Sequence, residues 1–308
     1  MNSRRDVVVA IDVGGTSMKC ALVDRDGTVV HTLRRPTGRE HGPDVVVDTI
    51  ADTAVELAES TQYRARAVGL VVPGIVDADT GVAVYAANLG WRDVPLRQRI
   101  EARTGLPTAL GHDVRAGGLA EARLGAGRGS DELLFIAIGT GIAGAHIVGG
   151  RSLTGAHGSA VELGHVVVRP GGAVCGCGQR GCVEAHGSAI AFEKRYVALA
   201  GQRATAEQII AAAGTDAVAA QAWRETIDVL ADGLLVAVAM LDPGTIVVGG
   251  GLASAGDALL SPLREALRAR ATFHSLPSLV VAELGDVAGC IGAAILGLER
   301  LEAQNEQV

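Results

Sequence analysis

Short apolar runs that end in glycine turns recur along the chain. Residues 7–11 form such a run, which stops at Asp12 and a Gly-Gly pair and has the character of a buried strand. Residues 19–24 alternate between apolar and polar side chains, and an Asp-Gly hairpin signal separates them from a third apolar segment, residues 28–33. The pattern therefore predicts three strands joined by tight turns at the start of the chain.

Helical spacing of apolar residues appears after these strands. It predicts helices over residues 43–59, 95–104 and 114–124, and short strands over 67–72 and 108–110. Residues 76–91 contain the turn sequence Asp-Ala-Asp-Thr-Gly and show neither period. We expect that segment to be irregular.

A second block repeats the opening arrangement. A strand over residues 133–138 ends in Gly-Thr-Gly, and residues 143–148 form its partner. Residues 151–182 are rich in glycine and lack helix signals, whereas helices resume from residue 188 and dominate 205–240. A strand over 245–248, a helix over 257–270, a strand over 279–282 and a terminal helix from 291 complete the chain.

The repeated feature is thus an apolar strand, a glycine-threonine turn and a returning strand. Mixed sheets with helices between them belong to the α/β class. Two such blocks predict two α/β lobes with a cleft between them. We place the smaller lobe at residues 1–112 plus 289–308, and the larger lobe at residues 113–288.

Composition narrows the function classes. The chain has 308 residues, a formal net charge of -7 and only 3% aromatic residues, so nucleic acid and anionic membranes are poor partners. The run 7–11 is too short for the apolar core of a secretion signal, and no uninterrupted apolar stretch reaches the ~18 residues of a membrane span. We therefore expect a cytoplasmic protein.

The two glycine turns are suited to phosphate. In Gly14-Gly15-Thr16 the backbone N–H groups can approach an anion without an intervening Cβ, and Thr16 adds a hydroxyl. Asp12 would repel phosphate unless Mg²⁺ lies between them. Neither turn matches a Walker A loop or a dinucleotide-binding turn, and a plain hairpin remains the alternative for each. A third turn, Gly249-Gly250-Gly251, could face adenosine or be only a strand-to-helix loop.

Three cysteines and a histidine are spaced like metal ligands. His165, Cys175, Cys177 and Cys182 fall within 18 residues, and this donor set suits tetrahedral, structural Zn²⁺. Three free thiols are the alternative, while Cys20 and Cys290 are isolated. Glu162 and Glu184 flank the set, and a bound metal would hold both carboxylates in place to accept hydrogen bonds from substrate hydroxyls.

Asp113 follows a predicted strand and precedes a predicted helix, at or near the helix N-terminus. A carboxylate there is favoured by the helix N-terminus, so Asp113 could be only a capping residue. It could equally be the general base that accepts a hydroxyl proton during phosphoryl transfer. The sequence alone leaves both roles open.

Together these motifs resemble the ROK family of sugar kinases and repressors, within the actin-like ATPase superfamily. The resemblance covers almost the whole chain and is carried by DVGGTSMK at 12–19, PGIVD at 73–77, ANLGW at 87–91, IGTGIAG at 138–144, ELGH at 162–165 and CGCGQRGCVE at 175–184. It implies a two-lobed, ribonuclease H-like fold with a zinc loop, closing over sugar and MgATP. It also implies a homodimer or homotetramer.

The resemblance further implies roles for individual residues. Asp113 matches the catalytic base. The sugar site would comprise Gly74, Asn88, His112, Asp113, Glu162, His165 and Glu184. The nucleotide site would comprise Asp12, Gly14, Gly15, Thr16, Lys19, Thr140, Gly141, Gly249, Gly250 and Gly251. The zinc ligands would be His165, Cys175, Cys177 and Cys182.

Two positions depart from the family pattern. The family usually has Asn where this chain has His112, and Ala145 replaces a frequent glycine.

We expect an ATP-dependent kinase that phosphorylates the 6-hydroxyl of a hexose, with glucose the favoured substrate. An N-acetylglucosamine or N-acetylmannosamine kinase is the alternative, and a non-catalytic sugar sensor is a further one. A repressor is disfavoured because the first strand begins near residue 7, without room for a helix-turn-helix.

Overall fold

The chain folds into two compact units. The computed structural model describes residues 4–306. Unit 1 comprises the described residues up to Ala120, the segment Thr154–Ser159 and the residues from Asp286 onward, and unit 2 comprises Glu121–Leu153 and Ala160–Gly285. The predicted division at residues 112 and 289 differs from this mainly in that most of the helix after residue 112, and Thr154–Ser159, lie in unit 1.

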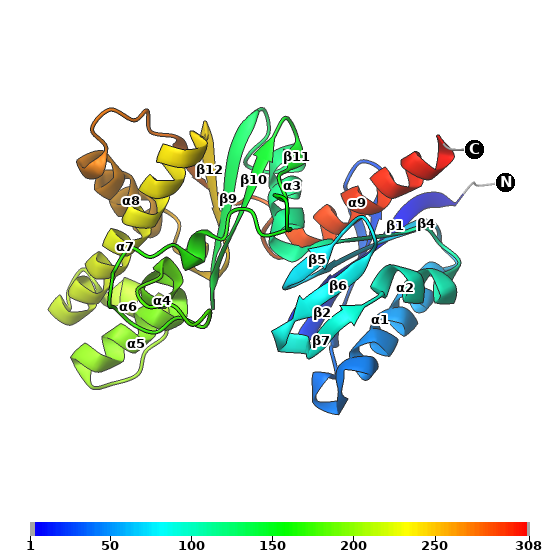
Figure 1. Ribbon diagram of the computed structural model, residues 1–308, viewed down its shortest axis with the longest axis horizontal. Coiled ribbons are helices and arrows are strands. Elements are labelled where there is room, and N and C mark those ends of the chain that lie inside the picture. The colour runs from blue at the N-terminus through cyan, green and yellow to red at the C-terminus, as the bar shows by residue number, and fades with distance from the viewer. Residues whose placement is uncertain (1–3, 307–308) are drawn as a thin grey trace. The chain divides into compact units, whose positions relative to one another are not determined.

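A five-stranded mixed sheet organises unit 1 (Figure 1). Its order is β3-β2-β1-β4-β8, with the antiparallel strands β2 and β3 on one side of β1 and the parallel strands β4 and β8 on the other. The strands are β1 (Arg5–Val13), β2 (Ser17–Asp24), β3 (Val29–Pro36), β4 (Tyr63–Val72) and β8 (Thr108–His112). The sequence pattern predicted all five, with the ends displaced by a few residues.

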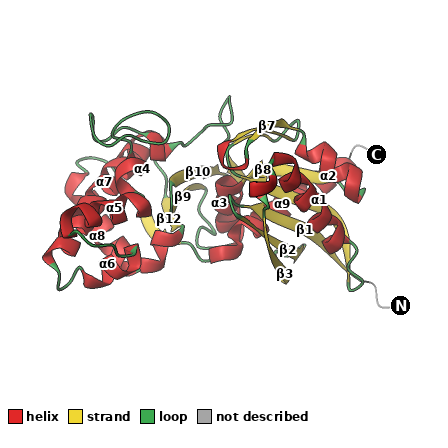
Figure 2. Ribbon diagram, turned by 90° about the horizontal axis from the view of Figure 1, so that it is seen from below, coloured by secondary structure: helices red, strands yellow, loops and turns green. Residues whose placement is uncertain are grey.

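Helices cover both faces of this sheet, which is why β1 is continuously apolar over residues 7–11. Alternate β1 side chains, such as Val9 and Ile11, join the core that includes α1 (Pro43–Ala58) and α2 (Leu96–Thr104). The intervening Val8 and Ala10 join the core that includes α3 (Asp113–Leu124) and α9 (Ala288–Asn305). Figure 2 shows α1, α2 and α9 beside the strands of this sheet.

A small three-stranded sheet occupies residues 75–94, where the sequence predicts irregular structure. It is built from β5 (Ile75–Asp77), β6 (Val82–Ala86) and β7 (Trp91–Val94), all antiparallel, with the 3₁₀ turn η2 (Ala87–Leu89) between the last two. The Asp77 carboxylate accepts hydrogen bonds from the backbone N–H groups of Asp79 and Thr80, which closes the first hairpin. The prediction was wrong because strands of three to five residues are too short to show a period.

Unit 2 repeats the topology of the unit 1 sheet. Its order is β11-β10-β9-β12-β13, formed by β9 (Glu132–Ile138), β10 (Ile142–Val148), β11 (Arg151–Ser152), β12 (Thr245–Gly249) and β13 (Ser278–Val281). Strands β9, β12 and β13 are parallel, and β10 and β11 return antiparallel, as β2 and β3 do in unit 1. The α/β class and the repeated strand-turn-strand arrangement are therefore confirmed.

The helices of unit 2 share one core with its sheet. They are α4 (Val183–Gly187), α5 (Ala189–Ala200), α6 (Ala206–Ala212), α7 (Ala217–Leu241) and α8 (Asp257–Arg270). Side chains from all five pack with Leu134, Ile136 and Ile138 of β9. Within residues 4–306, no helix is long and apolar enough to cross a membrane.

Candidate active site

Three candidate residues meet at one edge of the unit 1 sheet. Asp12 near the end of β1 pairs with Val71 of β4, and Val72 pairs with His112 at the end of β8. Because β1, β4 and β8 are parallel, their carboxyl ends lie at the same edge. The strand pairing thus brings Asp12 to the same edge as His112 and Asp113.

The electrostatics of Asp12 call for a cation. Burial raises the pKa of Asp12 to about 6, and the nearby negative charge of Asp113 adds to the increase. Lys19 opposes this shift, but its ammonium is already 2.8 Å from the carboxylate of Asp286, whose pKa it lowers. Two carboxylates that repel each other at one edge fit a Mg²⁺ ion, which oxygen ligands bind.

Asp113 is the first residue of α3, one position before the predicted start of that helix, and its two carboxylate oxygens differ. Oδ1 accepts a hydrogen bond from the backbone N–H of Val114 at 2.7 Å, whereas Oδ2 has no protein partner among residues 4–306. His112 Nδ1 accepts the backbone N–H of Arg115 at 3.4 Å. The first turn of the helix therefore uses one oxygen of Asp113 and leaves the other available to a substrate hydroxyl.

The first glycine turn leaves two adjacent N–H groups without a protein acceptor. Gly14 N–H donates to the Ser17 carbonyl at 2.9 Å, which closes the turn. Those of Gly15 and Thr16 donate to no group in the described part of the chain. Such paired N–H groups on a tight turn form a site for an anion.

The second turn has the same property in unit 2. Gly139 N–H donates to the Gly141 carbonyl at 2.9 Å, and Ile142 N–H donates to the Glu184 carboxylate at 2.8 Å. Thr140 and Gly141 keep N–H groups that no described residue accepts. Gly141 has a further reason to be glycine, since a Cβ there would lie 2.6 Å from Glu184 Oε2.

The third turn lies beside the second, because Gly139 and Gly251 approach each other. A Cβ on Gly139 would be 3.8 Å from the backbone nitrogen of Gly251. Gly250 has a φ of 80° and packs so closely that its Cβ would fall 2.6 Å from the backbone of Ile138. Packing alone thus explains Gly250, and Gly251 is the member of this turn closest to Gly139–Gly141.

Two candidate sugar-binding residues of unit 1 come from the small sheet. Gly74 has a φ of 95° and its Cβ would be 2.2 Å from the Tyr85 carbonyl, so only glycine fits. Asn88 in η2 is exposed, and its Cβ lies 3.7 Å from the place that a Cβ on Gly15 would take. The fold therefore places Asn88 next to the first glycine turn.

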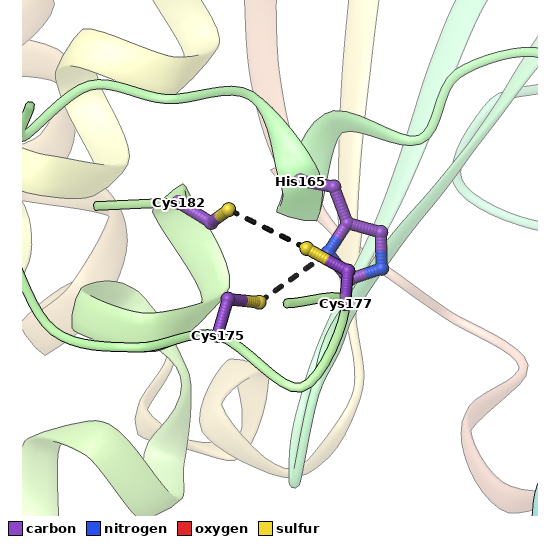
Figure 3. Close-up of side chains that lie close together, drawn as sticks. All are labelled: His165, Cys175, Cys177 and Cys182. Atoms are coloured by element: carbon purple, nitrogen blue, oxygen red, sulfur yellow. Dashed lines mark hydrogen bonds between the residues drawn. The ribbon is translucent and has the colours of Figure 1, made fainter. Parts of the chain in front are cut away.

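The four predicted zinc ligands converge in unit 2 (Figure 3). Their donor atoms all lie within 4.8 Å of one another. Cys175 Sγ is 3.6 Å from His165 Nδ1, and Cys177 Sγ is 3.8 Å from Cys182 Sγ. A tetrahedral zinc site requires separations of about 3.6 Å between sulfur and nitrogen and about 3.8 Å between two sulfurs. The donor set and these distances fit Zn²⁺.

Zinc bound here would also define the proton on His165. With Nδ1 among the ligand atoms, the proton of the ring lies on Nε2, which is 3.9 Å from Glu162 Oε2. Glu184 lies in the first turn of α4, two residues after Cys182. One donor and two carboxylates thus surround the zinc loop, which suits the hydroxyl groups of a sugar.

Three contacts at these sites have no signal in the sequence. Asp286 pairs with both Lys19 and Arg34, and Glu184 accepts the Ile142 N–H. Each partner lies more than 40 positions away in the chain. Only the folded backbone brings them together.

Comparison with known proteins places the chain in a family. The ROK family profile matches residues 8–300, and the chain belongs to that family. It is 35% identical to a glucokinase from Thermotoga maritima, over 96% of this chain and 98% of the relative, and 33% identical to an N-acetylmannosamine kinase from Escherichia coli, over 94% and 98%. A ROK family glucokinase from Streptomyces griseus, solved in complex with glucose and AMPPNP, is 30% identical with a TM-score of 0.81, covering 95% of this chain and 99% of that one.

Proposed function

We propose that the protein is an ATP-dependent hexose kinase that phosphorylates the 6-hydroxyl, with glucose as the favoured substrate. The observation that carries the proposal is the free Oδ2 of Asp113, at the sheet edge that also carries Asp12 and leads into the Gly14–Thr16 turn. The glucokinase relatives support glucose, and the AMPPNP complex of one of them supports ATP as donor. The predicted homodimer or homotetramer stays a prediction.

The proposed mechanism gives roles to residues of each unit by itself. In unit 1, Asp113 is the base, and Asp12 and the Gly14–Thr16 turn bind the nucleotide phosphates. In unit 2, the Thr140–Gly141 turn binds phosphate, and Glu162, His165 and Glu184 bind the sugar. Bound Mg²⁺ would neutralise phosphate charge beside Asp12. Asp113 Oδ2 accepts the 6-hydroxyl proton as that oxygen forms a bond to the γ-phosphorus; the bond to the β-phosphate oxygen breaks, and ADP leaves with the electron pair.

The test is an ADP-release assay against a panel of glucose, mannose, fructose, allose, N-acetylglucosamine and N-acetylmannosamine. Asp113→Asn should lower kcat by ~10²–10⁴-fold, because amide oxygen is too weak a base. Its matched control is Asp216→Asn, since Asp216 caps α7 through the same kind of bond, from Val218 N–H at 2.8 Å. The control should keep full turnover.

Each other outcome of the panel has a definite meaning. Turnover only on an N-acetylated sugar would replace glucose by the alternative substrate, which the N-acetylmannosamine kinase relative favours. Sugar binding without turnover on any substrate would replace the kinase by a sensor. A loss of only a few-fold in Asp113→Asn, with lowered Tm, would reduce Asp113 to a capping residue.

A further inference from the structure

One arginine lies beside the first glycine turn without a partner of its own. Arg39 belongs to the 3₁₀ turn η1 (Arg39–His41), which follows β3, and its side chain is exposed. Its guanidinium Nη1 is 3.9 Å from the place that a Cβ on Gly15 would take. Among residues 4–306, no carboxylate, carbonyl or aromatic ring pairs with this guanidinium.

The backbone ties Arg39 to that turn. Thr37 lies two residues before Arg39, and its backbone N–H donates a hydrogen bond to the Thr16 carbonyl at 3.0 Å. Thr37 itself is fully buried, so the start of the segment 37–42 is anchored. A backbone bond that does not involve the Arg39 side chain therefore holds the start of this segment beside the Gly14–Thr16 turn.

Three donors that have no partner in the described chain thus lie close together: the guanidinium of Arg39 and the N–H groups of Gly15 and Thr16. The charged guanidinium group and two free backbone N–H groups can together bind the oxygens of a phosphoryl group, because those oxygens accept bidentate hydrogen bonds from arginine. Asn88 borders the same region, at 3.7 Å from the Gly15 Cβ position. The phosphoryl group would therefore lie next to the amide that we assign to the sugar.

We infer that Arg39 completes a phosphoryl subsite with the Gly14–Thr16 turn. The inference rests on the proposed kinase function and adds a residue to it. The group bound is the terminal phosphoryl of the nucleotide or the phosphate of the phosphorylated sugar, and both share the same oxygen chemistry. In either position the guanidinium neutralises charge on the group that is transferred.

The experiment compares wild type, Arg39→Ala, Arg39→Lys and the control Arg224→Ala. Arg224 is an exposed arginine of α7 that also lacks a protein partner in the described chain, so the control removes the same charge from another surface. Binding of MgAMPPNP and of glucose 6-phosphate is measured by calorimetry, and kcat/KM for MgATP by ADP release. Arg39→Ala should lower kcat/KM by on the order of 10²-fold, with glucose affinity unchanged, and Arg39→Lys should lie between.

The two binding probes separate the sources of the phosphoryl group. Weaker MgAMPPNP binding in Arg39→Ala assigns the subsite to the donor, and weaker glucose 6-phosphate binding assigns it to the product. If Arg39→Ala binds both as wild type does and keeps kcat/KM, the subsite does not exist, while the kinase proposal stands. If wild type binds neither probe, the kinase proposal fails and the subsite with it.

Discussion

The carboxylate of Glu184 accepts the backbone N–H of Ile142 at 2.8 Å, and this bond joins the segment after the Cys-His cluster to the second glycine turn, Gly139–Gly141. Glu184 is two residues beyond Cys182, and Ile142 directly follows Gly141. The Glu184 side chain is therefore both a proposed sugar ligand and a group that stabilises a proposed phosphate-binding turn. A substitution in the turn should weaken sugar binding, and loss of the Glu184 carboxylate should weaken phosphate binding.

The first prediction concerns Gly141→Ala. A Cβ at this position would lie 2.6 Å from Glu184 Oε2, so the carboxylate must move and its bond to Ile142 N–H is lost. A hydrogen bond to a charged acceptor contributes about 1.5–3 kcal/mol, which sets the expected fall in unfolding free energy. KM should rise for both sugar and MgATP, as measured by steady-state kinetics.

A double-mutant cycle with Glu184→Ala tests the cause of that loss. In the Glu184→Ala background the alanine at 141 has no carboxylate to displace, so its additional cost in unfolding free energy should be much smaller. Equal costs of Gly141→Ala in both backgrounds, from urea unfolding, would show that the contact with Glu184 is not responsible.

The second prediction is that the metal cluster supports sugar binding. Cys177→Ser should remove the zinc, lower Tm and raise the KM for the sugar, because Glu162, His165 and Glu184 lose a common support. Elemental analysis should give one zinc per wild-type chain, and Cys20→Ala, whose thiol lies outside the cluster, should retain it. If zinc-free protein has the same KM for the sugar as wild type, the metal cluster does not support sugar binding.

How much of the site can be predicted from sequence depends on the distance between its parts. The four metal ligands fall within 18 residues and the phosphate turns are local motifs, so both are visible in the sequence. Lys19 and Asp286 are 267 positions apart, and Arg39 reaches Gly15 only because β2 and β3 pair. Val161, beside Glu162, takes a φ of 63° that β-branched residues rarely adopt, and no local rule anticipates it.

The third prediction concerns His112, where the family pattern has Asn. His112 Nδ1 accepts the Arg115 N–H at the start of α3, and an Asn oxygen can accept the same bond. His112→Asn should therefore keep Tm within a few degrees, while the ratio of kcat/KM among hexoses changes. His112→Ala, which has no acceptor, should lose about 1 kcal/mol of stability. Identical hexose ratios in wild type and His112→Asn would exclude His112 from sugar selection.

The fourth prediction concerns the pH dependence of Asp12. Its pKa in the folded protein is raised from 3.8 to about 6, so the folded state holds this proton more tightly than the unfolded state. Stability from this group is therefore present below about pH 4 and is lost as pH rises through 6. A shift of about two pKa units corresponds to roughly 3 kcal/mol. Asp12→Asn removes the buried charge, so it should be more stable than wild type at pH 7.5 by up to that amount and equal to it near pH 4.

Asp286→Asn provides a matched control, because the pKa of Asp286 is shifted in the opposite direction to that of Asp12. The pKa of Asp286 is lowered by its bond to Lys19, so the neutral amide should bring no gain in stability at pH 7.5.

Mg²⁺ should raise the Tm of wild type at pH 7.5 more than that of Asp12→Asn, because the cation offsets the charge on the carboxylate. Turnover should fall in Asp12→Asn even as its stability rises, since the same charge that destabilises the empty site binds the metal. Equal Mg²⁺ responses in both proteins, read from thermal melts, would show that Asp12 does not bind the cation.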